Sequence, residues 1–167
     1  YEQIGSNGGT IRQPDATELV IPAGSLSTNT PLKMAIIPLA DFASKAPAEL
    51  KPATSIPPRL TLKSAVYTFD TRGRAVHGAR LSMLIPTDVR DDELTTVDLY
   101  AWDGNAWQWQ PTTVVPDEDQ IYTTLSMLPK AVALFAVAAP RATVGAMMTG
   151  AGTLADDSVD VLTEVTL

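Results

Sequence analysis

Short apolar segments alternate with clusters of proline, glycine, asparagine and aspartate from residue 17 to residue 139. Within several segments the apolar residues recur at every second position, as in Leu81, Met83 and Ile85. A period of two places alternate side chains on opposite faces of a strand, and frequent turn signals between such segments are typical of antiparallel sandwiches. The pattern predicts strands near residues 9–13, 17–22, 31–38, 59–69, 79–86, 95–102, 105–112, 120–126 and 131–139.

Two connections between these strands have more specific signals. The sequence Asp103-Gly104-Asn105 favours a tight hairpin, because glycine and asparagine accept the positive φ of such turns. Residues 39–58 form the longest connection, in which residues 41–45 are expected to make one short helical turn. The four prolines that follow exclude a long helix there.

We therefore predict an all-β fold, an antiparallel β-sandwich of about nine strands within residues 1–139. Its core is expected to bury the apolar residues that share one face of each strand. These residues are Val20, Leu32, Met34, Ile36, Leu62, Val66, Leu81, Met83, Ile85, Leu99, Trp107, Leu134 and Phe135.

The C-terminal part of the chain has a different character. Residues 140–157 are rich in glycine, alanine and threonine and have no repeating apolar face, which is typical of a leash. Residues 158–167 are predicted to form an extra strand, since their apolar positions alternate. The side chains expected to bind a partner are Val159, Val161, Thr163, Val165 and Leu167. This strand pairs either with its own sandwich or with a neighbouring subunit, and the sequence leaves both alternatives open.

Composition excludes several classes of partner and site. The 167 residues include no cysteine, so neither a disulfide nor a thiolate metal site is available. The formal net charge of −7 repels nucleic-acid phosphates and anionic lipid headgroups. The longest apolar run, residues 131–139, is about half of what a membrane-spanning helix requires. We thus expect no nucleic-acid partner and no membrane insertion.

A low proportion of charged residues (19%) and 13 prolines are typical of a secreted or surface-displayed bacterial β-protein. We therefore expect an extracellular location at the bacterial cell surface. The chain begins at Tyr1 without the basic and apolar regions of a signal peptide, which indicates a processed form or an excised piece.

Several stretches resemble one known family. They are Gly8-Gly9-Thr10-Ile11, residues 19–26 (LVIPAGSL), residues 66–73 (VYTFDTRG) and residues 99–107 (LYAWDGNAW). Together they are similar to the zona-occludens/uncoordinated-five domain of ankyrins and netrin receptors, which has bacterial cell-surface relatives. The resemblance covers roughly residues 8–139, and it implies a β-sandwich scaffold rather than a particular ligand.

Some relatives of that family cleave themselves at a His-Phe-Ser motif before the last strand. The corresponding stretch here is Ala131-Val132-Ala133, which has neither a hydroxyl nucleophile nor an imidazole. The sequence therefore predicts no self-cleavage.

Other candidate chemistry is sparse. His77 is the only histidine, and no Gly-x-Ser-x-Gly motif accompanies it, so we expect a solvated turn residue and no catalytic site. Acidic clusters could form a weak calcium site, although the ordered ligand spacing of an EF-hand loop is missing and solvated turns are the alternative. These clusters are Asp88 with Asp91, Asp92 and Glu93, then Asp117, Glu118 and Asp119, and finally Asp156 and Asp157. No other cofactor is expected.

The three tryptophans allow a further interpretation. Trp107 and Trp109 lie two apart on one predicted strand, so both are expected to pack in the core. Trp102, on the opposite flank of the hairpin, is predicted to be the exposed one and therefore a candidate glycan contact.

These observations favour a non-catalytic structural or interaction module of an extracellular bacterial assembly. Its partners would be other protein subunits, including copies of itself, joined by addition of the terminal strand. The alternative is a sandwich that binds carbohydrate or cell wall.

Overall fold

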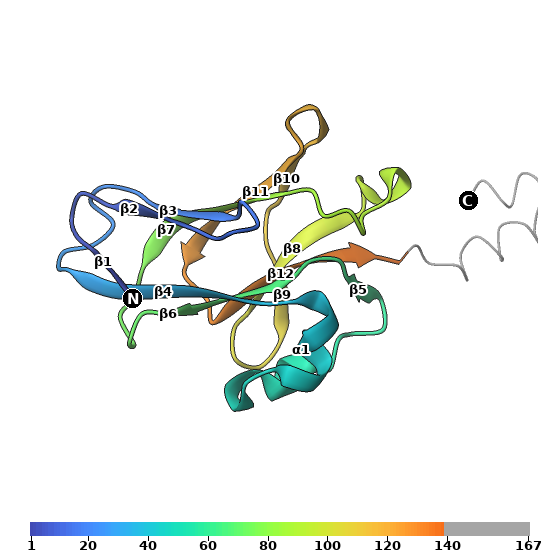
Figure 1. Cartoon of the computed structure of the whole chain (residues 1–167), viewed down its shortest axis with the longest axis horizontal. Helices are drawn as coiled ribbons and strands as arrows, with labels where there is room; N and C mark the ends of the chain where they lie inside the picture. The colour runs from blue at the N-terminus through green and yellow to red at the C-terminus, as the bar shows by residue number, and fades with distance from the viewer. Residues whose placement is uncertain (139–167) are drawn as a thin grey trace, which may run out of the picture. The chain divides into compact units, whose positions relative to one another are not determined.

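Two antiparallel sheets pack against each other in the computed structural model, which describes residues 1–138 (Figure 1). The predicted all-β sandwich is thereby confirmed. The predicted leash at residues 140–157 and the terminal strand at 158–167, with Val159, Val161, Thr163, Val165 and Leu167, lie outside the described residues.

The larger sheet is built around one strand that is buried on both faces. In spatial order its strands are β1 (Glu2–Ile4), β4 (Thr30–Ile37), β6 (Val66–Asp70), β12 (Ala131–Val137), β8 (Val97–Trp102) and β9 (Trp107–Trp109), and β5 (Leu60–Leu62) pairs with β12 beyond the end of β6. The first six residues of β12 are all buried. An uninterrupted apolar sequence is required in such a strand because neither of its faces contacts water.

The smaller sheet contains five strands. Their order is β10 (Thr113–Val115), β11 (Gln120–Met127), β7 (His77–Leu84), β3 (Glu18–Ile21) and β2 (Gly9–Arg12). Along β7 the buried residues Ala79, Leu81 and Met83 alternate with more exposed ones, as the two-residue period predicted. This sheet therefore has one face on the core and one in water.

The core between the sheets contains many of the residues expected there. Leu32, Met34, Leu81, Met83, Leu99 and Leu134 are buried in it, and Ile36 and Ile85 pack against it. Val20 was predicted wrongly, because its neighbours Leu19 and Ile21 are the buried residues of β3. In the apolar triplet Leu19-Val20-Ile21, periodicity alone does not identify the inward face.

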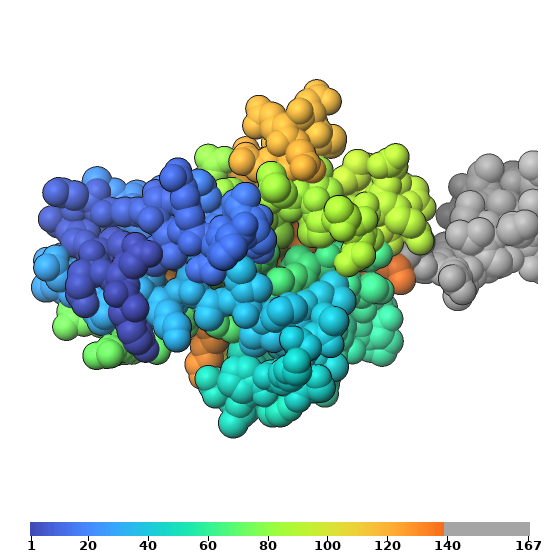
Figure 2. Space-filling view, in the orientation of Figure 1, coloured from blue at the N-terminus to red at the C-terminus, as the bar shows by residue number. Residues whose placement is uncertain are grey.

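A second apolar cluster lies on the outer face of the larger sheet. The helix α1 (Leu39–Lys45) and the 3₁₀ segment η1 (Ala48–Thr54) cover this face, on the side opposite the smaller sheet (Figure 1). In the space-filling view this α1–η1 segment, coloured teal, protrudes beside β4 (Figure 2). Val66, Trp107 and Phe135 are buried as predicted, but in this second cluster rather than between the sheets, and Leu62 is partly buried against it. The short helical turn expected at residues 41–45 is confirmed within α1.

The strands number twelve among residues 1–138, rather than about nine. The short edge strands β1 and β10 escaped prediction, and the strand expected at 59–69 is divided into β5 and β6. At the division, the backbone N–H of Leu134 donates to Ser64 Oγ at 2.9 Å, while Lys63 N–H donates to Leu134 O at 2.8 Å. A serine side chain thus replaces one backbone partner and interrupts the regular ladder.

The lateral edges of both sheets are short, since β1, β2, β9 and β10 have only three or four residues each. A tight turn from Gly5 to Gly8 joins β1 to β2. Gly8 has φ 71°, and a Cβ there would lie 2.2 Å from the carbonyl oxygen of Ile21, so only glycine fits. Short edges limit unwanted pairing with other chains.

Among the described residues, no helix is long and apolar enough to cross a membrane.

Candidate interaction groove

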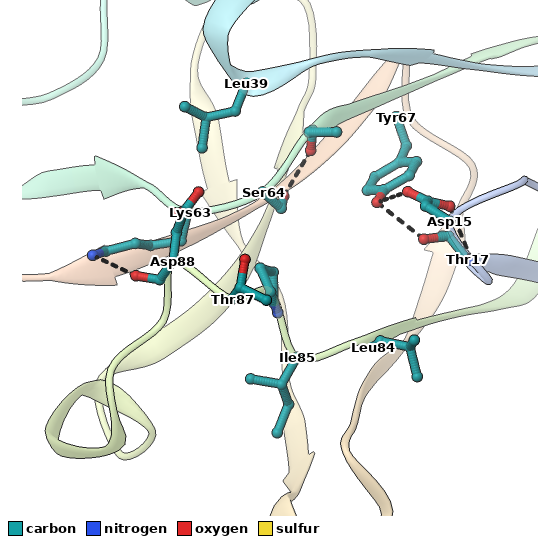
Figure 3. Close-up of a pocket in the computed structure, with 12 residues that line it drawn as sticks. Asp15, Thr17, Leu39, Lys63, Ser64, Tyr67, Leu84, Ile85, Thr87 and Asp88 are labelled. Carbon is teal, nitrogen blue, oxygen red and sulfur yellow. Dashed lines mark hydrogen bonds between the residues drawn. The ribbon is translucent and has the colours of Figure 1, made fainter.

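A groove opens between the junction of β5 with β6 and the C-terminal end of β7, with a volume of about 280 Å³ (Figure 3). We call it the β6–β7 groove. Its lining residues come from four separate segments of the chain. They are Asp15, Thr17, Leu39, Lys63, Ser64, Ala65, Tyr67, Leu84, Ile85, Pro86, Thr87 and Asp88.

The groove exists because β3 is shorter than its neighbour β7. β3 pairs with β7 only at residues 80–82, whereas β7 continues to Leu84. On its other side β7 remains paired with β11 as far as the Leu84–Gln120 pair. Within residues 1–138, no strand therefore pairs with Met83 and Leu84 on the β3 side.

Two leucines give the groove an apolar rim. Leu39 is 37% exposed and Leu84 is 45% exposed. In the close-up, Leu39 lies on one side of the groove, and Leu84 and Ile85 lie on the other (Figure 3). Exposed leucines at two sides of a cavity form a surface that another apolar chain segment can cover.

One end of the groove is closed by a hydrogen-bonded set of polar side chains. The Tyr67 hydroxyl donates to Asp15 Oδ2 at 2.6 Å and accepts from Thr17 Oγ1 at 3.0 Å. Burial, and then the hydrogen bond to Asp15, raise the pKa of Tyr67 above its ordinary value. Tyr67 therefore stays protonated near neutral pH, and its role here is to tie the β2–β3 loop to β6.

The other end carries a charged pair. Lys63 Nζ lies 2.9 Å from Glu93 Oε1 and donates to the Asp88 carbonyl oxygen at 3.2 Å. Both side chains of the pair are only 13% exposed. The backbone N–H of Arg90 and the Lys63 ammonium hold the pKa of Glu93 below its ordinary value. The ammonium and the carboxylate thus neutralise each other.

Ser64 is the hydroxyl at the centre of the groove. It donates to the Ala65 carbonyl oxygen at 2.6 Å and accepts from Leu134 N–H, and neither partner is a base that could activate it. The hydroxyls of Thr17, Ser64 and Tyr67 and the Lys63 ammonium are engaged with their own neighbours, and the apolar rim of the groove is open.

The structure corrects the predicted exposure of the tryptophans. Trp102 is 2% exposed and Trp107 is also buried, whereas Trp109 is 55% exposed. The cause is the α1–η1 segment, which covers the outer face at Trp107 and accepts its indole N–H on the carbonyl oxygen of Ala53 at 2.9 Å. Trp102 consequently offers no exposed ring to a glycan, and the packing expected of Trp109 is also wrong.

Among the other candidate residues, Asp88 lines the groove, and its carbonyl oxygen accepts from Lys63. His77 is exposed at the start of β7, with Nδ1 3.1 Å from the Ser126 carbonyl oxygen. Asp92 pairs with Arg90, as Glu93 does with Lys63. Within residues 1–138, no three acidic or histidine side chains converge as metal ligands, and Asp156 and Asp157 lie outside the described part. A weak calcium site stays an untested prediction.

Sequence reasoning missed the residues that form the groove. Leu39 follows a strand and precedes prolines, and Leu84 occupies an outward position of β7, so neither carried a distinguishing signal. The hydrogen bond between Tyr67 and Asp15 joins residues 52 apart in the sequence and depends on the packing of the two sheets.

Neither protein-family models nor curated proteins gave any match to this chain. The resemblance to the zona-occludens/uncoordinated-five domain therefore stays a prediction.

Proposed function

We propose that this chain is a non-catalytic interaction module of an extracellular bacterial assembly, and that subunits join by strand addition. The β6–β7 groove is the proposed acceptor. The observation that carries the proposal is the combination of an apolar rim, Leu39 and Leu84, with an end of β7 that lacks a strand partner on one side. Strand addition uses both features, since backbone hydrogen bonds give affinity and side-chain pockets give specificity.

The proposed occupant is the segment 159–167 of a neighbouring copy. Its apolar residues recur at every second position, so one face of an added strand would place them between the two rim leucines. The 20 residues from 139 to 158 can span roughly 60–70 Å when extended. That length is sufficient to reach another subunit.

The test compares the mass in solution of the full chain with that of a variant lacking residues 141–167, over a range of concentrations. We expect the full chain to form concentration-dependent oligomers and the truncated chain to be monomeric. Equal masses for the two chains at every concentration would overturn assembly through this segment.

Paired substitutions make the test specific to the face of the added strand. V161D with V165D places charges on the face proposed to enter the groove, whereas L162D with T166D places the same charges on the opposite face. On the acceptor side, L84D is matched by M127D, because Met127 is also exposed but does not line the groove. We expect V161D/V165D and L84D to abolish oligomers and both controls to retain them.

A further inference from the structure

The outer face of β8 and β9 carries a row of aromatic side chains. Val97, Leu99 and Ala101 point into the core between the sheets, so Asp98, Tyr100 and Trp102 share the opposite face. On β9, Trp107 lies opposite Trp102, and Trp109 lies opposite Tyr100. Directly opposed side chains on neighbouring strands are close enough to form one continuous surface.

Only half of this row is covered. Trp102 and Trp107 are buried in the cluster beneath α1 and η1. Beyond that cover, Trp109 is 55% exposed and Tyr100 is partly exposed. We call the open half, formed by Asp98, Tyr100 and Trp109, the aromatic shelf.

The Tyr100 ring of the shelf is held in place from below. It packs edge to face against the buried Phe135, with 5.4 Å between centroids. Burial raises the pKa of Asp98, and the Trp109 and Thr112 side chains oppose that rise. A ligand would therefore meet a Tyr100 ring that is already oriented, which reduces the entropy lost on binding.

The shelf also offers one polar group. Asp98 lies on the same face of β8 as Tyr100, two residues along the strand, and is partly buried. A carboxylate accepts hydrogen bonds from hydroxyl groups. A ligand rich in hydroxyl groups can use it.

We infer that the aromatic shelf binds a neutral pyranose ring of a saccharide. The apolar C–H face of such a ring stacks on the Trp109 indole, and its hydroxyl groups reach Asp98. About half of a tryptophan surface, on the order of 100 Å², is open for this contact. The net charge of −7 disfavours acidic sugars.

The small extent of the shelf favours a sugar over a protein partner. A specific protein interface buries about 800 Å² on each partner and uses about 20–30 residues of each. The shelf comprises three side chains on two strands, of which β9 has only three residues, and the cluster under α1 and η1 bounds it. The inference is independent of strand addition, because none of the shelf residues lines the β6–β7 groove.

The test titrates the full chain with cellohexaose and with chitohexaose, two neutral oligosaccharides, and records calorimetric heat and tryptophan fluorescence. We expect dissociation constants in the range of about 0.1–10 mM for at least one of them. The bound sugar should protect Trp109, the exposed tryptophan, from acrylamide quenching. W109A should weaken binding at least tenfold.

The matched control is Y1A, which removes an equally exposed aromatic ring (54%) elsewhere on the sandwich and should bind as the unmodified chain does. L84D should also bind normally, so a failure of strand addition is distinguishable from a failure of the shelf. The inference is overturned if neither oligosaccharide binds up to about 10 mM. Unchanged binding by W109A would overturn it as well. So would protection of Trp109 from quenching that is equally strong without the oligosaccharide and is caused by association of the chain with another protein molecule.

Discussion

The hydroxyl of Tyr67 donates a 2.6 Å hydrogen bond to the carboxylate of Asp15, and this contact joins the two sheets of the sandwich. Tyr67 belongs to β6 in the larger sheet, and Asp15 to the loop between β2 and β3 in the smaller one. Thr17 donates to the same hydroxyl from the same loop. The Tyr67 phenol thus helps to hold the β2–β3 loop against the larger sheet, together with Gln13, whose Nε2 donates to the Met34 carbonyl oxygen at 3.0 Å.

Replacing Tyr67 by phenylalanine should lower the free energy of unfolding by about 1–2 kcal/mol, because a hydrogen bond to a carboxylate is lost and the Thr17 hydroxyl loses its acceptor. Urea denaturation near pH 7 measures this change. Y122F is the control, since it removes a hydroxyl from a partly exposed ring stacked against Arg80. An equal loss of stability in both variants would contradict the role given to Tyr67.

The raised pKa of Tyr67 also predicts a dependence of stability on alkaline pH. The folded protein retains this proton at pH values where the unfolded chain has lost it, so stability should fall as pH rises above about 10. Y67F should show a smaller decrease between pH 9 and pH 11 than the unmodified chain. Parallel slopes for the two proteins would contradict this assignment.

The two buried tryptophans should differ in their response to the same substitution. W107F leaves the Ala53 carbonyl oxygen without its indole partner, whereas Trp102 Nε1 is the one buried side-chain polar atom without a partner among the described residues. Both changes remove a similar volume from one cluster, so W107F should cost about 1–3 kcal/mol more than W102F. Thermal or urea unfolding of the two variants measures the difference. A larger loss for W102F would show that the unpaired indole has a partner after all.

Ala16 has a left-handed backbone conformation, with φ 65°, in the turn from β2 to β3. Its N–H donates to the Gln13 carbonyl oxygen at 3.0 Å, so the turn fixes this conformation. Because a Cβ is unfavourable there, A16G should raise the free energy of unfolding by about 0.5–1 kcal/mol. A75G, at an exposed alanine without positive φ, should have no stabilising effect. A destabilised A16G would contradict the prediction.

The low pKa of Glu93 predicts a contribution to stability that disappears in acid. Its carboxylate is stabilised in the folded state by the Arg90 N–H and by Lys63, so the contribution is present above the unfolded pKa near 4.3 and is lost as pH falls below it. E93Q should be less stable than the unmodified chain at pH 7 and equally stable at about pH 2–3. D117N, at an exposed acid on η3 (Pro116–Glu118), is the control. A stability difference for E93Q that persists unchanged in acid would contradict the ion pair as its cause.

Local sequence determined the fold class and several turns. The two-residue period of segments such as β7 requires strands with one buried face, and frequent prolines and glycines limit their length. At Asp103-Gly104-Asn105 the hairpin formed as expected. Gly104 has φ 108°, and Asp103 Oδ1 accepts from the N–H groups of Asn105 and Ala106. The prolines after Lys45 likewise restrict the helix to seven residues.

Only the tertiary structure decided which surfaces are covered. The register of the hairpin places Trp102 opposite Trp107, whereas the sequence predicted one exposed and the other packed. The segments α1 and η1 fold over that face and stop short of Trp109. The β6–β7 groove likewise depends on β3 beginning at Glu18, opposite Ser82 and two residues before β7 ends, which is a matter of register between distant segments. Periodicity is a property of each strand alone, whereas burial on a second face and the ends of a ladder depend on contacts between residues far apart in the chain.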